Sequence, residues 1–257
     1  MEQDRRTFLH TLTAAAVSVT LAVEDTPSQT AFQKSKIKAI AFDAFPIFDP
    51  RPISALAESL FPNNGAALMN AWRIRQFEYQ WLRTMAGQYR DFLHATDESL
   101  TFAANQLNLE LTAEKRKKLM SAWMQLTVWP DAAEALQKLK SAGYRMIFLS
   151  NMTAEMLNVG LREAKLGHLF EAIISTDQIK AYKPETKAYK LGIDRLKLKK
   201  EEVLFAAFAG WDVAGAKWFG YPTYWVNRLG SPAEELGVTA DFIGKDLKDL
   251  TNFLIPS

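Results

Sequence analysis

The stretch that most constrains the fold of this chain is an apolar run that ends in an aspartate. Five of the six residues in 37–42 are apolar, Asp43 follows directly, and Pro46 comes three residues later. A short apolar run closed by a turn signal is typical of a strand buried on both faces of a parallel sheet. Because Pro46 cannot donate to a sheet ladder, we expect this strand to end near Phe45.

Asp43 is therefore expected at the carboxyl end of the first core strand. In open α/β sheets that edge is where ligands bind. An aspartate that only caps a turn is the alternative, and the residues that end the later strands decide between the two.

Composition narrows the chemistry that is available to this chain. The net charge of +2 gives no reason to expect nucleic acid or an anionic membrane as a partner. The absence of cysteine excludes disulfides, a thiol nucleophile and thiolate zinc sites. Only His10, His94 and His168 are present, so we expect no histidine-rich metal site.

The first 22 residues have the layout of an export signal. Arg5 and Arg6 precede an uncharged run from Leu12 to Ala22. This run is shorter than a helix that spans a membrane. The arginine pair followed by Thr-Phe-Leu resembles a twin-arginine signal. We therefore predict an export signal and linker over 1–34 and a periplasmic or secreted protein with no stable membrane anchor. A cytoplasmic protein is the alternative.

The rest of the chain predicts an α/β core with a helical insertion. Between 53 and 127, apolar residues recur at three- and four-residue spacing without a strand signal. Strands alternating with helices after Pro130 imply parallel pairing and right-handed crossovers. The strands are expected at 144–149, 170–175, 203–208, 224–226 and 241–243. We predict a doubly wound parallel sheet with a Rossmann-like core over 35–52 and 128–257, and an inserted all-helical cap over 53–127.

Polar residues gather at one edge of this predicted sheet. Ser150 and Asn151 end one strand, and Lys183 precedes a helix. Another strand ends in a loop at Gly210-Trp211-Asp212, before a helix expected from Val213. A lysine beside a carboxylate favours its ionised form, which makes Asp43 a competent nucleophile or base. Backbone N–H groups at a strand-to-helix turn favour an anion. The pattern predicts an anionic substrate and covalent aspartyl chemistry.

The order of these motifs resembles that of the haloacid dehalogenase (HAD) superfamily. The helical segment is similar to the cap of the L-2-haloacid dehalogenases (type II) in Trp72-Arg73, Glu78-Tyr79, Trp81-Leu82-Arg83, Tyr89 and Phe92. The core is similar to them in Tyr182-Lys183-Pro184-Glu185, Tyr189, Trp211-Asp212, Gly215-Ala216 and Phe219-Gly220. The resemblance covers nearly everything after residue 36 and implies a HAD-like fold.

The resemblance also implies a reaction and its residues. Short (S)-2-haloacids would be hydrolysed to 2-hydroxy acids through an ester on Asp43, without a metal or cofactor, in a homodimer. Arg73 would receive the halide, Lys183 would orient Asp43, and Asp212 would position or activate water. Ser150 and Asn151 would hold the substrate carboxylate and the halide side. The pocket would be lined by Phe45, Phe92 and Trp211, and Tyr189 would support the helix that follows Lys183.

Several positions depart from related patterns. HAD phosphatases carry a second aspartate two residues after the nucleophile, where this chain has Phe45, which argues against a magnesium site. Phe45-Pro46-Ile47 replaces Tyr-Gly-Thr of the dehalogenases, and Ala207-Phe208-Ala209-Gly210 replaces Ser-Ser-Asn. Two alternatives therefore remain: another HAD-fold hydrolase of a small carboxylate, and a catalytically weakened anion-binding relative.

Overall fold

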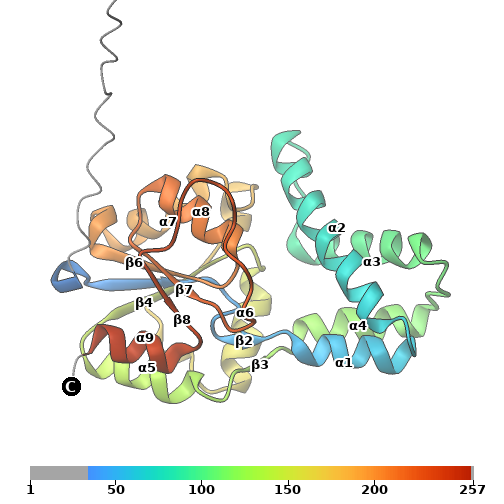
Figure 1. The fold of residues 1–257 in the computed structure, drawn as a ribbon, viewed down its shortest axis with the longest axis horizontal. Helices are drawn as coiled ribbons and strands as arrows, with labels where there is room; N and C mark the ends of the chain where they lie inside the picture. Colours follow the sequence, from blue (N-terminus) through green and yellow to red (C-terminus); the bar gives the residue numbers. More distant parts are fainter. Residues whose placement is uncertain (1–33, 256–257) are drawn as a thin grey trace, which may run out of the picture. The chain divides into compact units, whose positions relative to one another are not determined.

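The computed structural model describes residues 34–255 and contains a six-stranded parallel sheet (Figure 1). The strand order is β5-β4-β1-β6-β7-β8. Their bounds are β1 Ala39–Phe42, β4 Arg145–Ser150, β5 Ala172–Ser175, β6 Val203–Ala207, β7 Thr223–Val226 and β8 Phe242–Gly244. The predicted α/β fold with a parallel sheet is confirmed.

Strand β1 ends at Phe42, three residues earlier than we expected. The chain turns at once, because the backbone N–H groups of Ile47 and Phe48 both donate to the carbonyl of Ala44. Phe42 pairs with Phe148 of β4 on one side and with Ala206 of β6 on the other. The register therefore places Asp43 between the ends of these two neighbouring strands.

Helices cover both faces of the sheet, as in a doubly wound fold (Figure 1). Ile40 and Phe42 point into one apolar cluster with α5 (Ala132–Ser141), α6 (Ala154–Glu163) and α9 (Leu247–Leu254). Ala39 and Ala41 point into a second cluster with α7 (Thr186–Leu196) and α8 (Gly210–Phe219). This alternation follows from the two-residue period of a strand. Short 3₁₀ helices span Lys34–Lys36, Gly167–Leu169, Thr176–Ile179 and Lys200–Glu202.

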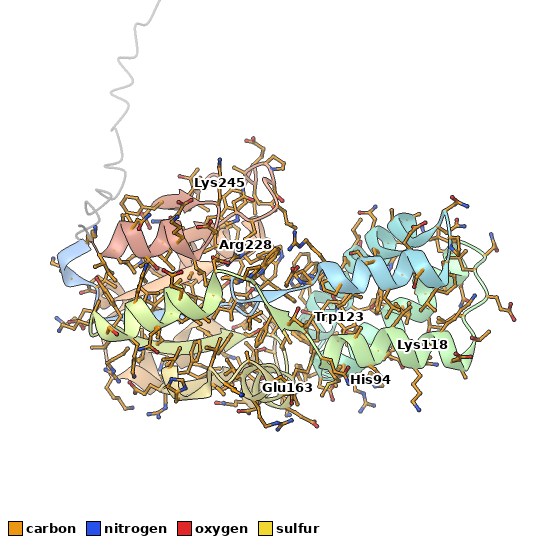
Figure 2. All side chains as sticks on the ribbon, turned by 90° about the horizontal axis from the view of Figure 1, so that it is seen from below. His94, Lys118, Trp123, Glu163, Arg228 and Lys245 are labelled. Carbon is orange, nitrogen blue, oxygen red and sulfur yellow. The ribbon has the colours of Figure 1, made fainter. Side chains whose placement is uncertain are left out.

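Four consecutive helices lie between Asp49 and Thr127: α1 Arg51–Leu60, α2 Gly65–Met85, α3 Phe92–Gln106 and α4 Ala113–Met124. The hydroxyl of Thr112 caps α4 by accepting from the backbone N–H of Lys115. Trp72 and Trp123 are buried and pack edge-on at 6.0 Å. Trp123 also packs edge-on against Phe45, so the inner end of α4 reaches the loop after Asp43 (Figure 2).

A second, two-stranded sheet joins the ends of this helical segment. Strand β2 (Phe48–Asp49) pairs antiparallel with β3 (Thr127–Val128), and the sequence predicted neither strand. Two-residue strands are too short to show a period in the sequence. The division into a core over 35–52 and 128–257 and a cap over 53–127 stays a prediction.

The predicted export signal falls almost wholly on residues 1–33, which lie outside the described residues. Within the described part of the chain, every helix is too short or too polar to cross a membrane.

Candidate active site

A buried lysine joins two carboxylates at the edge of the sheet. Lys183 has no exposed surface, and its Nζ donates to Asp43 Oδ1 at 3.0 Å and to Asp212 Oδ2 at 2.6 Å. Asp43 follows β1 and Asp212 follows the neighbouring β6, while Lys183 enters from the loop before α7. The structure therefore brings together three of the four residues that we predicted to be catalytic.

The three charges together carry an excess of one negative charge, and this shapes their protonation. Burial raises the pKa of Asp212 to about 6, although the Lys183 ammonium opposes the rise. Burial alone would lower the pKa of Lys183, but Asp212 and Asp43 outweigh it and raise that pKa. Lys183 is thus an ammonium at neutral pH, and Asp212 titrates near the physiological range.

Asp212 lies in a helix and not in the loop where we expected it. Helix α8 begins at Gly210, so Asp212 is in its first turn, where the helix dipole favours a carboxylate. The Oη of Tyr189 donates to Asp212 Oδ1 at 2.6 Å. A Cβ on Gly215 would come within 2.3 Å of that Oη, so only glycine allows α8 to approach Tyr189 this closely.

The turn after β4 holds the loop that carries Lys183. The Oδ1 of Asn151 accepts from the backbone N–H of Lys183 at 2.8 Å and from Thr176 Oγ1 at 3.2 Å. Its Nδ2 donates to Gln80 Oε1 of α2 at 3.2 Å. Ser150 Oγ accepts from the backbone N–H of Met152 at 3.2 Å, which fixes the turn.

A cavity of about 220 Å³ opens beside Asp43. Among the predicted site residues, the cavity wall includes Asp43, Arg73, Ser150, Asn151, Phe45, Phe92 and Trp211. Three others are buried and are not part of that wall: Lys183 and Asp212, which are linked to Asp43, and Tyr189, which contacts Asp212. Tyr189 therefore supports the charge cluster from behind.

Arg73 provides a cation to this cavity from helix α2. Its guanidinium lies 5.3 Å from the ring centre of Phe45, 4.7 Å from Phe77 and 5.1 Å from Trp123. Burial among these rings lowers its pKa to about 10, and Asp43 opposes the change, so Arg73 is charged at neutral pH. The nearby Glu78 forms its ion pair with Arg75, at 2.9 Å.

Sequence reasoning missed other residues of the cavity wall, among them Phe77, Gln80 and Phe208. Trp81, the residue after Gln80, donates through Nε1 to the backbone carbonyl of Lys183 at 3.2 Å. The signal was present, because residues 73, 77 and 80 are spaced i, i+4 and i+7 and so share one face of a helix.

Arg228, which we had left without a catalytic role, holds the loop after Asp43 in place. Its Nε and Nη2 donate to the carbonyl of Pro46 at 3.0 and 2.8 Å, and Nη1 pairs with Asp131 at 2.9 Å. Arg228 therefore positions the Asp43 loop from outside the cavity.

Known proteins resemble this chain over most of its length. A family model described as haloacid dehalogenase-like hydrolase matches residues 11–220. The (S)-2-haloacid dehalogenase 4A of Burkholderia cepacia is 45% identical over 168 residues, which cover 65% of this chain and 73% of that protein. An (S)-2-haloacid dehalogenase of Pseudomonas sp. (strain YL) is 34% identical over 80% of this chain and 89% of its own length.

Solved structures agree with the sequence matches. The L-2-haloacid dehalogenase RSc1362 superposes with a TM-score of 0.83 at 35% identity, covering 85% of this chain and 98% of the other. The L-2-haloacid dehalogenase of Xanthobacter autotrophicus with chloropropionic acid covalently bound gives 0.77 at 32% identity, with the same coverage. The family match runs through Asp43, Lys183 and Asp212. The match therefore includes both the fold and the charged residues of the site. The chain belongs to the haloacid dehalogenase-like hydrolases.

Proposed function

We propose that this protein hydrolyses short (S)-2-haloacids to 2-hydroxy acids through an ester on Asp43. The observation that carries the proposal is the position of Asp43, whose carboxylate borders the cavity on one side and Lys183 on the other. Relatives at 34% and 45% identity are (S)-2-haloacid dehalogenases, and a structural neighbour holds chloropropionic acid covalently. The product is a 2-hydroxy acid because hydrolysis replaces the halide at C2 by a hydroxyl.

The two carboxylate oxygens of Asp43 have different roles in this reaction. Oδ1 accepts a hydrogen bond from Lys183 Nζ. Within the described residues, Oδ2 accepts only a 3.4 Å hydrogen bond from the Phe45 N–H. Oδ2 is thus the freer nucleophile. It attacks C2 of the substrate, the carbon–halogen bond breaks, and the halide leaves as an anion.

The ester is then hydrolysed at the Asp43 carbonyl carbon. Oδ1 has become the carbonyl oxygen and keeps the Lys183 ammonium beside it, so the negative charge that forms there is stabilised. Asp212 accepts the proton of the attacking water. The bond between the carbonyl carbon and Oδ2 breaks, Asp212 returns the proton to Oδ2, and Oδ2 leaves as the hydroxyl of the product.

The remaining cavity residues bind the substrate. The charged Arg73, set among aromatic rings, receives the halide, and the turn at Ser150 and Asn151 binds the carboxylate. Phe45, Phe92 and Trp211 form the apolar walls. A cavity of about 220 Å³ suits a short acid.

Isotope labelling tests the covalent route. A single turnover with excess enzyme in ¹⁸O-water is expected to label the Asp43 carboxylate and leave the product unlabelled. Asp43→Asn is expected to abolish alkylation, because a neutral amide is a far weaker nucleophile. Label found first in the product, or activity retained by Asp43→Asn, would refute the ester.

We further propose that the reaction needs no metal. Phe45 puts an aromatic ring where a metal-binding carboxylate would stand, and Asp43 and Asp212 are both paired with Lys183. Within residues 34–255 no three side chains of the types that bind metals gather. EDTA is expected to leave halide release unchanged, and rescue of an EDTA-treated enzyme by magnesium would contradict this.

Export through a twin-arginine signal over residues 1–22 is also a proposal, supported by Arg5 and Arg6 in front of an uncharged run. The Arg5→Lys, Arg6→Lys double variant is expected to stay in the cytoplasm. Equal amounts of parent and variant in the periplasm would refute the signal.

A homodimer is a further proposal, which comes from the resemblance. Leu82 and Met85 on α2 are 57% and 85% exposed, a surface that a second copy of the chain could cover. Light scattering after gel filtration is expected to give twice the chain mass for the parent and a lower mass for Leu82→Lys, Met85→Lys. A monomeric parent would contradict the proposal.

A further inference from the structure

Gln80 on α2 is a buried side chain with an unused hydrogen-bond donor at the cavity. The residue has no exposed surface, lines the cavity beside Asp43, and its Nε2 has no partner among the described residues. A buried donor that lacks a partner is costly, and such groups concentrate where a ligand or water completes the bonding.

The surrounding hydrogen bonds fix which end of the Gln80 amide is free. Asn151 Oδ1 accepts from the backbone N–H of Lys183, and a backbone N–H can only donate. The Nδ2 of Asn151 is therefore the atom that faces Gln80, so Gln80 must offer its oxygen in return. The Nε2 of Gln80 is left as the free end.

The cavity wall holds a second buried N–H donor without a hydrogen-bond partner among the described residues. The Nε1 of Trp211 is also buried without a partner within the described residues, and Trp211 comes from the core whereas Gln80 comes from α2. Two unpaired N–H donors at one cavity indicate a ligand that carries hydrogen-bond acceptors. An anionic carboxylate has two such oxygens.

We propose that Gln80 Nε2 donates a hydrogen bond to the carboxylate of the substrate, and that it thereby selects for acids over neutral halides. This assignment rests on the proposed function. Gln80 contacts Asn151 at the Ser150–Asn151 turn, the end of the cavity that binds the carboxylate. Arg73 lies seven residues earlier on α2, about 10 Å along the helix axis, and serves the halide end.

The alternative is that Gln80 only braces Asn151, and Gln80→Glu separates the two. This substitution keeps an oxygen for Asn151 Nδ2 but replaces the free N–H₂ by a second acceptor, which repels a carboxylate. Gln80→Met removes both functions without adding charge and keeps the test open if the first variant fails to fold. Thr84→Val is the control, since Thr84 does not line the cavity and its Oγ1 links α2 to the core by accepting from Tyr182 N–H at 3.1 Å.

The assay is the dissociation constant of propionate, an unreactive short carboxylate, measured by calorimetry on the full chain at pH 8. Loss of a hydrogen bond to a charged group predicts a rise of roughly 10- to 100-fold for Gln80→Glu and Gln80→Met. The defect of Gln80→Glu should shrink at pH 5, relative to the parent at that pH, as the introduced carboxyl regains a proton to donate. Thr84→Val should stay within about twofold of the parent, the size of a small surface effect.

A dissociation constant within twofold of the parent for Gln80→Glu would overturn the proposal. An equal loss in Thr84→Val would also overturn it, because Gln80 would then act by holding α2 to the core. Halide release from 2-chloropropionate is measured in parallel. If the parent releases halide but Gln80→Glu binds propionate normally, only the role of Gln80 is refuted. If Gln80→Glu binds propionate more weakly but the parent releases no halide, only the proposed function is refuted.

Discussion

Replacing Lys183 by methionine should reveal how much the buried charge cluster depends on its one cation. Lys183 has no exposed surface, and the Asp212 carboxylate that it contacts is 1% exposed. Lys183→Met fills nearly the same volume but leaves two neighbouring carboxylates without their counter-charge. Removing one partner of a buried ion pair costs about 3–5 kcal/mol, and each kcal/mol shifts the Tm of a chain this size by roughly 2–4 °C. We expect a Tm lower by about 6–20 °C.

A matched control separates the effect of burial on the Tm from the effect of losing an ion pair. Lys190 contacts Asp194 at the same 2.6 Å, but its side chain is 57% exposed. An exposed pair is worth about 0–1 kcal/mol, so Lys190→Met should change the Tm by no more than about 4 °C. Adding Asp212→Asn to Lys183→Met removes the more deeply buried of the two uncompensated charges and should recover part of the lost stability.

The pH dependence of Lys183→Met has a definite sign. Without the ammonium, burial holds the pKa of Asp212 above its already raised value of about 6. A carboxyl whose folded-state pKa is raised binds its proton better in the folded state, so stability rises as pH falls toward the unfolded value. Melting curves by circular dichroism from pH 8 to pH 5 should show the variant approach the parent. A Tm loss under 2 °C at pH 8, or a gap that widens on acidification, would refute the reasoning.

Two further substitutions test the support of Asp212. Tyr189→Phe removes the hydrogen bond that lowers the pKa of Asp212, so the acidic limit of ester hydrolysis, expected near pH 6, should move to higher pH in a rate profile. An unchanged limit would exclude Asp212 as its source. Gly215→Ala adds a Cβ 2.3 Å from the Tyr189 Oη and should cost about 1–3 kcal/mol in urea unfolding. Gly167→Ala, where the added Cβ meets nothing within 4 Å, is the control.

The parts of the fold that the sequence predicts best are those whose signal is local. Each core strand is a short apolar run, and the polar residue that ends it is visible beside it, so Asp43 and the turn at Ser150 could be placed on one edge. The same locality explains an error. Gly210 resembles a turn signal, but here it begins α8, so Asp212 belongs to a helix.

What the sequence could not supply is which side of a helix meets which neighbour. Helix α2 buries Leu68 and Trp72 within the helical segment and also directs Arg73 and Gln80 toward the cavity. With apolar residues on more than one side, the 3.6-residue period does not mark a single inner face. The unpaired Nε2 of Gln80 depends on a chain of hydrogen bonds through Asn151 to the Lys183 backbone, three segments far apart in sequence.

The site serves the two half-reactions unequally. Alkylation needs a desolvated carboxylate and a cation for the halide, and Asp43 and Arg73 supply both. Hydrolysis needs donors for the oxyanion at Asp43 Oδ1, and within the described residues Lys183 alone donates to it. Phe45 and Phe208, with ring centres 5.6 Å apart, line the cavity where dehalogenases carry hydroxyl-bearing motifs. A missing donor costs about a hundredfold in rate or more.

Halide release should therefore show a burst of about one equivalent per chain, followed by slow turnover, with the ester on Asp43 detectable by mass spectrometry. A linear time course without trapped ester would mean that Lys183 suffices.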